Sequence, residues 1–243
     1  MTTGPVGISD LIGMTNATLA KRTITQDGTL LKPSKPITTV DSFFSSNAGP
    51  DNGLDAGAQR SPPPGHVYTT YTGDTLSDPT AWYFVSFQMT ADWGIPAADF
   101  YPPLPTTAGS SVVYRSFDSG AGCVNGAAAS TCITAVSSFG EAVLMAPTSN
   151  HANVTGGTDY APTVSTVWPA CPSSGAVLLG ELQKYVSVSP QRFKGVTCTS
   201  SGVAATVVGT AGESVVVTAI KADKTVVVMD VVIPASGSKS ILV

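Results

Sequence analysis

Short segments rich in Val, Ile, Thr and aromatic residues, separated by turns that contain Gly, Pro, Asn or Asp, recur along most of the chain. This pattern is typical of β-strands, because β-branched and aromatic side chains fit a pleated sheet, while Gly and Pro punctuate it. The segments predicted as strands are residues 37–44, 67–71, 81–89, 112–117, 141–145, 163–168, 176–179, 185–188, 192–198, 203–208, 213–220 and 225–233. Residues 81–89 are almost continuously apolar, which suits a central strand.

The C-terminal strands give the clearest pattern. Residues 209–212 and 221–224 divide the last apolar region into three strands and have the composition of hairpin turns. Roughly ten short strands at a spacing of about 8–12 residues predict a mainly β fold, an antiparallel β-sandwich.

The first 36 residues carry a different pattern. Val6 and Ile8 are apolar and lead into polar residues, as at the end of a short buried strand. Asn16 suits a helix N-cap, because residues 17–22 contain good helix formers. Residues 27–28 are Asp-Gly, which predicts a turn. A strand, a helix and a turn at this point are expected to be the end of a larger unit.

This segment also carries a motif. It consists of Gly4-Pro5-Val6, Ile8-Ser9-Asp10, Gly13, Asn16, Leu19, Lys21, Asp27-Gly28 and Leu31. In order and spacing these residues resemble a segment of raffinose synthases and related alpha-galactosidase-like glycosidases. Gly7 departs from that family, which tends to carry an aromatic residue there.

The resemblance implies that the segment corresponds to the last strand and helix of a catalytic (β/α)8 barrel, followed by an all-β C-terminal domain. It also implies that the two catalytic aspartates belong to earlier barrel strands, so this chain alone is expected to be inert. The expected organisation is a barrel-end segment (residues 1–45), a linker rich in Gly, Ala, Asn, Asp, Ser and Pro (residues 46–65), and a β-sandwich domain (residues 66–243).

Composition excludes two classes of partner. Charged residues make up 12% of the chain, the net charge is −4, and Lys and Arg do not cluster, so nucleic acid is not an expected partner. No apolar run approaches the ~18–20 residues needed to span a bilayer, so no membrane partner is expected either.

The four cysteines predict disulfides in an oxidising compartment, since their number is even and their spacing is not that of a metal site. Pairing close in sequence closes loops with little strain. The expected bridges are Cys123–Cys132 and Cys171–Cys198.

Two N-glycosylation sequons, at Asn16 and Asn153, together with abundant Ser and Thr, predict a secreted extracellular glycoprotein. The first residues lack the pattern of a signal peptide. A portion of the protein upstream of the chain would reconcile these two observations.

Three residues are candidates for binding carbohydrate. By the resemblance, Asp10 lies where a barrel strand ends and would line the rim of a sugar pocket; helix capping is the alternative. Trp93 and Tyr101 lie in a Pro-rich stretch predicted as a loop, where flat rings can stack on sugars or pack against a sandwich edge. Trp82 lies in a predicted strand and is expected in the core.

A glycosidase needs two carboxylates about 5–9.5 Å apart. The chain has three glutamates, Glu141, Glu181 and Glu213. Asp92 and Asp99 flank Trp93 and form the one carboxylate–aromatic group, for which ordinary turns are the alternative. No catalytic residue is assigned within the chain.

The two histidines, His66 and His151, lack partners at the spacing of a metal site or a catalytic triad. The Gly-rich loops lack the lysine of phosphate-binding motifs. The sequence therefore predicts no metal and no cofactor.

Two functions remain open. The first is the non-catalytic C-terminal β domain of a secreted, carbohydrate-active protein, whose partners would be the barrel portion, carbohydrate or another copy of the protein. The alternative is a structural or adhesive extracellular glycoprotein subunit that reuses this β domain.

Overall fold

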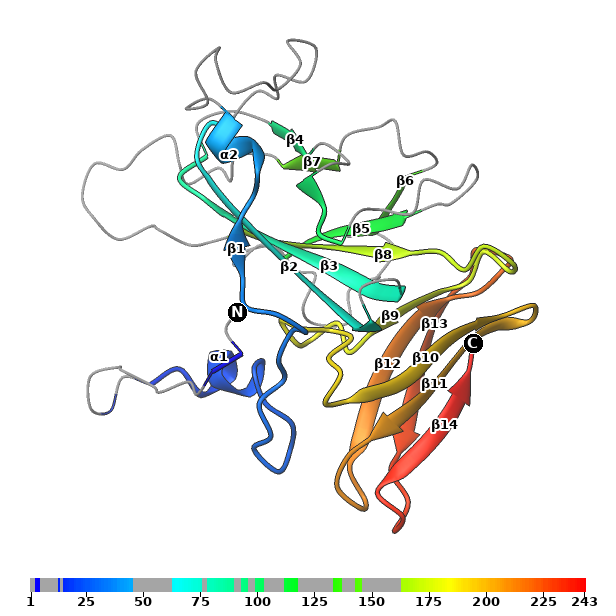
Figure 1. The fold of residues 1–243 in the computed structure, drawn as a ribbon. Helices are drawn as coiled ribbons and strands as arrows, with labels where there is room; N and C mark the ends of the chain where they lie inside the picture. Colours follow the sequence, from blue (N-terminus) through cyan, green and yellow to red (C-terminus); the bar gives the residue numbers. More distant parts are fainter. Residues whose placement is uncertain are drawn as a thin grey trace.

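Antiparallel sheets make up most of the regular secondary structure in the described part of the chain (Figure 1). The computed structural model describes residues 3–4, 13, 15–45, 63–75, 78–89, 93–95, 99–102, 112–117, 133–136, 143–145 and 163–243. Every strand pair within these residues is antiparallel. The prediction of a mainly β, antiparallel fold is confirmed.

The larger sheet has six strands in the order β1-β2-β3-β8-β5-β6. Its strands are β1 (Thr38–Thr39), β2 (His66–Thr75), β3 (Asp78–Phe87), β8 (Thr163–Pro169), β5 (Val112–Phe117) and β6 (Ile133–Val136). A separate two-stranded sheet pairs β4 (Trp93–Ile95) with β7 (Val143–Met145).

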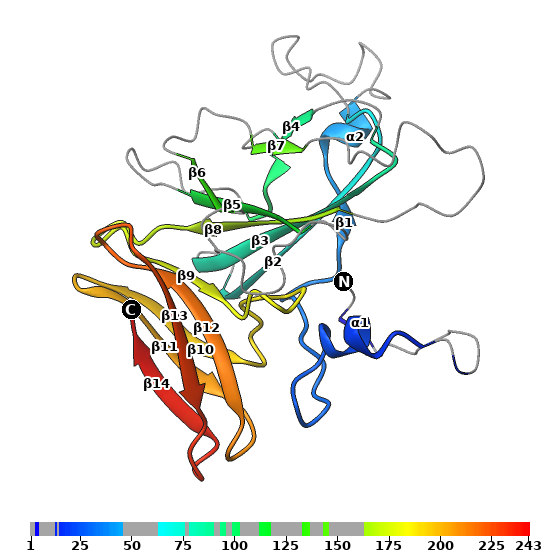
Figure 2. The same cartoon turned by 180° about the vertical axis from the view of Figure 1, so that it is seen from behind.

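The C-terminal part is a sandwich of two three-stranded sheets, seen from both sides in Figures 1 and 2. One sheet contains β10 (Phe193–Thr199), β11 (Gly202–Val208) and β14 (Ser238–Leu242). The other contains β13 (Val226–Val232), β12 (Ser214–Ile220) and β9 (Val177–Gly180). Val215 and Val217 of β12 are buried in the core, whereas Ser214 is exposed, as the period of two in a strand requires.

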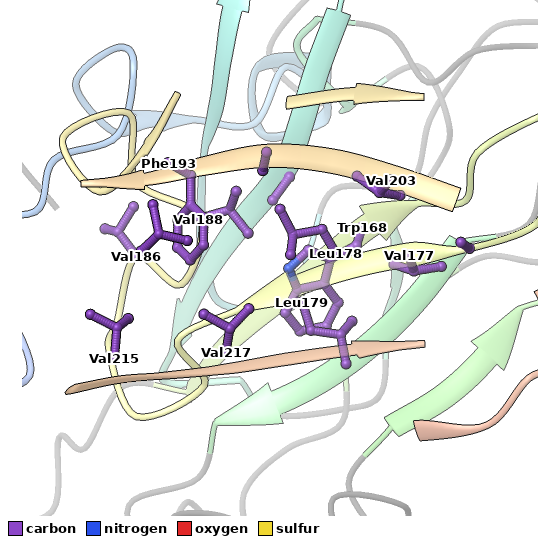
Figure 3. Close-up of a cluster of buried hydrophobic side chains, with 14 of the residues drawn as sticks. Trp168, Val177, Leu178, Leu179, Val186, Val188, Phe193, Val203, Val215 and Val217 are labelled. Carbon is purple, nitrogen blue, oxygen red and sulfur yellow. The ribbon is translucent and has the colours of Figure 1, made fainter. Parts of the chain in front are cut away.

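A single cluster of buried side chains connects the sandwich with the larger sheet. Tyr83 of β3 and Trp168 of β8 join it from the larger sheet. Figure 3 shows Trp168 beside Leu178 and Leu179, with Phe193 and the β12 valines lining the same space.

A second cluster lies on the opposite face of the larger sheet, where Trp82 and Phe84 pack with Ile95 and Phe100. Tyr83 therefore points one way, and its neighbours Trp82 and Phe84 point the other. This arrangement explains the continuous apolar run in β3, and it confirms the prediction that Trp82 is a core residue.

The N-terminal helix and turn occur where the sequence predicts them. Helix α1 (Ala17–Lys21) is capped by Asn16, whose Oδ1 accepts hydrogen bonds from the N–H groups of Thr18 (3.1 Å) and Leu19 (3.2 Å). Gly28 adopts φ +86°, which a non-glycine residue rarely adopts, at the predicted turn. Residues 5–12 lie outside the described residues, so the barrel-end interpretation stays a prediction.

One predicted strand is wrong in part, and another is wrong. Residues 37–44 contain only the short β1 and then helix α2 (Ser42–Ser45). Residues 185–188 form turns, because Gly180 (φ +74°) redirects the chain and the Glu181 N–H then donates to the Ser187 carbonyl (2.9 Å). A side chain at Gly180 would collide with that carbonyl.

Strand β14 was not predicted. Its sequence, SKSIL, is polar over most of its length, because the strand lies at a sheet edge and is largely exposed.

Candidate functional site

Several predicted residues lie outside the described part of the chain: Asp10, Asp92, Cys123, Cys132, Glu141, His151 and Asn153. Their roles stay predictions.

Trp93 and Tyr101 have different surroundings. Trp93 belongs to strand β4, so its placement in a loop was wrong, and it is only 7% exposed within the second core cluster. Tyr101 is 45% exposed, but the ammonium of Lys35 lies 3.8 Å from its ring centroid, and the ring of Tyr71 meets it edge-on at 6.2 Å. Of the two, Tyr101 retains aromatic surface that a sugar could reach.

Asp99 is buried and serves to hold helix α2. Its carboxylate accepts a hydrogen bond from the Ser42 N–H (3.2 Å) and another from the Ser42 hydroxyl. These contacts fix the start of α2, as expected for a carboxylate at a helix N-terminus.

Four aromatic side chains follow one another across α2, β2 and β3. Phe43 lies 6.1 Å from His66, His66 stacks on Phe87 at 4.9 Å, and Phe87 stacks on Tyr68 at 5.6 Å between ring centroids. Stacked rings cover each other's faces, whereas a sugar needs a free face. The row therefore fits packing better than carbohydrate binding.

Of the predicted modification sites, two fall within the described residues. The Cys171–Cys198 disulfide is confirmed, with a Cα–Cα distance of 5.4 Å. Asn16 is exposed, and it caps α1 through Oδ1, so the amide nitrogen that would carry a glycan takes no part in the two capping bonds. Glycosylation of Asn16 stays a prediction.

A concentration of buried charge lies between the two sheets of the sandwich and the N-terminal segment. Arg192 Nε donates to Glu181 (2.8 Å), Nη2 donates to Glu213 (2.5 Å), and Nη1 donates to Glu213 (3.0 Å) and to the Val208 carbonyl (2.7 Å). We call Glu181, Arg192 and Glu213 the Arg192 cluster. Gly209 makes the close approach possible, because a side chain there would collide with both the Glu213 carboxylate and the guanidinium.

The pKa values of the two carboxyl groups of this cluster are shifted in opposite directions. Burial is the largest influence on Glu181 and raises its pKa above the ordinary 4.5, although Arg192 and Lys184 favour the charged form. Burial also acts on Glu213, but hydrogen bonds from Arg192 and from the Thr210 N–H outweigh it and hold the pKa of Glu213 below 4.5. Burial lowers the pKa of the Lys184 ammonium, against the opposing effect of Glu181.

The N-terminal segment (residues 15–34) is bound by hydrogen bonds beside the Arg192 cluster. The ammonium of Lys184 donates to the carbonyls of Lys21 (2.7 Å) and Ile24 (2.6 Å), at the end of α1 and just beyond it. The N–H of Tyr185 donates to the carbonyl of Arg22 (3.1 Å). Lys184 thereby supplies a donor to the Lys21 carbonyl, which the helix C-terminus leaves unpaired, and a second donor to the carbonyl of Ile24 beyond the helix.

Two further contacts continue the attachment. The N–H of Gln26 donates to Glu213 (3.4 Å), and the N–H of Lys32 donates to the side chain of Gln191 (2.8 Å). A cleft of about 380 Å³ lies along this junction. Its lining consists of Lys21, Ile24, Thr25, Gln26, Glu181, Gln183, Lys184, Glu213, Ser214 and Val216.

Glu181, Lys184 and Glu213, which line the cleft, all make hydrogen bonds within the protein. Glu181 and Glu213 both accept hydrogen bonds from Arg192, and Lys184 donates to two main-chain carbonyls. A catalytic carboxylate has to face its substrate. The observed arrangement instead holds two segments of the chain together.

Sequence reasoning noted Glu181 and Glu213 but did not connect them, and it missed Arg192 and Lys184. Glu181 and Glu213 lie in different connections, so no spacing along the chain joins them. One feature of the sequence could have indicated a buried charge: Glu181 directly follows the apolar strand β9 in a chain that has few charged residues.

Within the described ranges, no helix has the length and apolar character needed to cross a membrane. In the same residues, no group of three or more His, Cys, Asp or Glu side chains is arranged to hold a metal ion. A comparison with protein-family models found no family that matches the chain, and a comparison with curated proteins found no similar sequence.

Proposed function

We propose that the chain is the non-catalytic C-terminal β domain of a secreted, carbohydrate-active protein similar to alpha-galactosidases and raffinose synthases. Its role is to pack against the catalytic barrel and to hold the last barrel helix in place. Carbohydrate and the barrel portion are its partners in this proposal.

The observation that carries the proposal is the attachment of the N-terminal segment. The residues that resemble the family end in α1 and the following turn, and this stretch is bound by Lys184, Tyr185 and Glu213 of the sandwich. A β domain that supports a barrel needs a fixed contact of this kind with the last barrel helix.

The upstream reading frame gives the first test. We expect it to encode the earlier strands of a barrel, two of them carrying the catalytic aspartates. A reading frame without such strands would overturn the proposal and favour the structural glycoprotein subunit.

The second test uses the long protein and the variant Lys184→Ala. Lys184→Ala removes two charge-assisted hydrogen bonds, each typically worth about 1.5–3 kcal/mol, so galactosidase activity should be lost at a lower temperature than in the wild type. Lys194→Ala is the matched control, because Lys194 is exposed on β10. Equal heat inactivation of both variants would count against a supporting role for the junction.

A further inference from the structure

The cleft between the N-terminal segment and the sandwich has room for a small molecule. Its volume of about 380 Å³ lies within the range of about 300–1,000 Å³ that is common for small-molecule sites. The lining comes from residues 21–26, 181–184 and 213–216. The hydrogen bonds of Lys184 to the N-terminal segment hold the sides of the cleft in place, so the site is formed before any ligand arrives.

One buried carboxylate oxygen of the lining is left for a ligand. Glu181 is only 8% exposed, and its Oε2 accepts a hydrogen bond from Arg192 Nε. Among the described residues, no hydrogen bond reaches its Oε1. A buried acceptor without a hydrogen bond is costly, and burial accordingly raises the pKa of Glu181. A ligand that donates a hydrogen bond to Oε1 removes part of this cost.

Hydrogen-bond donors are available beside this oxygen. The ammonium of Lys184 has three N–H groups, and two of them bind main-chain carbonyls, which leaves the third. In the described part of the chain, the side-chain amides of Gln26 and Gln183 and the hydroxyl of Ser214 make no hydrogen bond, and all three residues are exposed. Amides and hydroxyls can both donate and accept.

The charges around the cleft disfavour an ionic ligand. Lys21 and Lys184 are cationic, whereas Glu181 and Glu213 carry carboxyl groups. An anion would meet the two carboxyl groups and a cation would meet the two ammonium groups, and like charges brought together oppose binding. A hydroxyl group is neutral, and it can donate to a carboxylate while it accepts from an ammonium. The lining therefore suits a neutral molecule with several neighbouring hydroxyl groups.

We propose that this cleft binds the terminal unit of a neutral saccharide. One sugar hydroxyl donates to Glu181 Oε1 and accepts from the remaining N–H of Lys184, and the exposed amides and hydroxyl of the lining bind the neighbouring hydroxyl groups. Ile24 and Val216 offer apolar surface to the C–H groups of the ring. The choice of a saccharide among neutral polyhydroxyl compounds rests on the proposed function.

An NMR titration of the purified chain with galactose tests the proposal. We expect a dissociation constant in the millimolar range, because the ligand makes few contacts in an open cleft. Ser214→Leu removes a hydroxyl and fills part of the cleft, so it should raise the dissociation constant about tenfold or more. Ser200→Leu is the matched control, because Ser200 is exposed in the turn between β10 and β11 and does not line the cleft.

A second variant tests the hydrogen bonds without filling the cleft. Gln183→Ala should raise the dissociation constant for galactose about threefold to tenfold, the usual effect of losing one hydrogen bond. Its urea denaturation should match that of the wild type, because the exposed Gln183 side chain makes no hydrogen bond within the described residues. Circular dichroism checks that each variant is folded.

The charged probes are acetate and methylammonium, and each should bind more weakly than galactose. The proposal is overturned by no binding of galactose at tens of millimolar, by equal affinity of S214L and the wild type, or by tighter binding of either charged probe. The upstream reading frame tests the proposed function separately. Barrel strands in that frame together with no binding of galactose would overturn this inference alone, whereas binding that S214L weakens, in a protein without barrel strands, would overturn the proposed function alone.

Discussion

Arg192 donates four hydrogen bonds from a buried guanidinium, and the two carboxylates that accept three of them come from different connections of the sandwich. Removal of one partner from such a group leaves an unpaired buried charge, which typically costs 3–5 kcal/mol. The opposite pKa shifts of Glu181 and Glu213 add a dependence on pH that can be tested residue by residue.

The first prediction concerns Glu213→Gln. The pKa of Glu213 is lower in the folded protein than its ordinary 4.5, so below pH 4.5 the unfolded chain binds more protons at this group. Stability from Glu213 is therefore complete above pH 4.5 and is lost as the pH falls through the folded pKa. We expect the variant to show a shallower loss of unfolding free energy below pH 4.5, measured by urea denaturation.

Glu181→Gln is the paired control. The pKa of Glu181 is raised by burial, so its contribution is complete below pH 4.5 and is lost as the pH rises through the folded pKa. This variant should change the slope above pH 4.5 and leave the acid side unchanged. Identical pH profiles in the two variants would contradict the opposite shifts.

Residue-level prediction succeeded where a side chain is governed by its own strand. Trp82 lies in an apolar run and is buried as expected. The prediction that Trp93 lies in a loop was wrong for two reasons. The pairing of β4 with β7 joins residues about 50 positions apart, and the local sequence is Pro-rich. The Arg192 cluster could not be predicted for the same reason, since its partners meet only in the folded chain.

At the scale of elements, periodicity located most strands of the sandwich. The hairpin of β12 and β13 and the helix capped by Asn16 are set by local residues, and both were predicted. Residues 185–188 have the composition of a strand, and Val186 and Val188 are buried as a strand would require. Their conformation is set by the turn at Gly180 together with the contacts to Arg22 and Tyr83, which lie far away in sequence.

The second prediction concerns the Cys171–Cys198 disulfide, which joins two residues 27 positions apart and encloses β9 and the connection that contains Lys184. The chain-entropy model gives about 3.5 kcal/mol for a loop of this length. We expect the double variant Cys171→Ala/Cys198→Ala to lose about 3 kcal/mol in urea denaturation.

The variant Cys123→Ser/Cys132→Ser is the control, since its predicted loop is shorter and should matter less. Unchanged stability without the Cys171–Cys198 bridge would count against this account. Mass mapping of unreduced peptides tests the predicted Cys123–Cys132 bridge directly.

At the scale of the whole molecule, the larger sheet and the sandwich share one core. Ala81, Tyr83 and Trp168 pack in the same cluster as Phe193, Val217 and other sandwich residues. A shared apolar core couples the stabilities of the parts that contribute to it. The predicted division into residues 1–45, 46–65 and 66–243 stays a prediction, but Leu31 of the first part is buried in this same core.

The last prediction tests this coupling through Tyr83. Its buried hydroxyl accepts a hydrogen bond from the Val188 N–H (3.1 Å), so the larger sheet and the β9–β10 connection are linked by a polar contact within the core. Tyr83→Phe leaves that N–H buried without a partner, which should lower the unfolding free energy by about 1–3 kcal/mol.

Tyr68→Phe is the control, because it makes the same chemical change on β2, where the ring is partly exposed. Its unfolding free energy should stay within about 0.5 kcal/mol of the wild-type value. Tryptophan fluorescence reports on the larger sheet and β4, because the three tryptophans are Trp82, Trp93 and Trp168, and far-UV circular dichroism reports on all strands. If the core is shared, both signals should move together in Tyr83→Phe, whereas separate transitions would show that the sheet and the sandwich fold independently. Equal losses of stability in the two variants would contradict the role of the Tyr83 hydroxyl as a hydrogen-bond acceptor in the core.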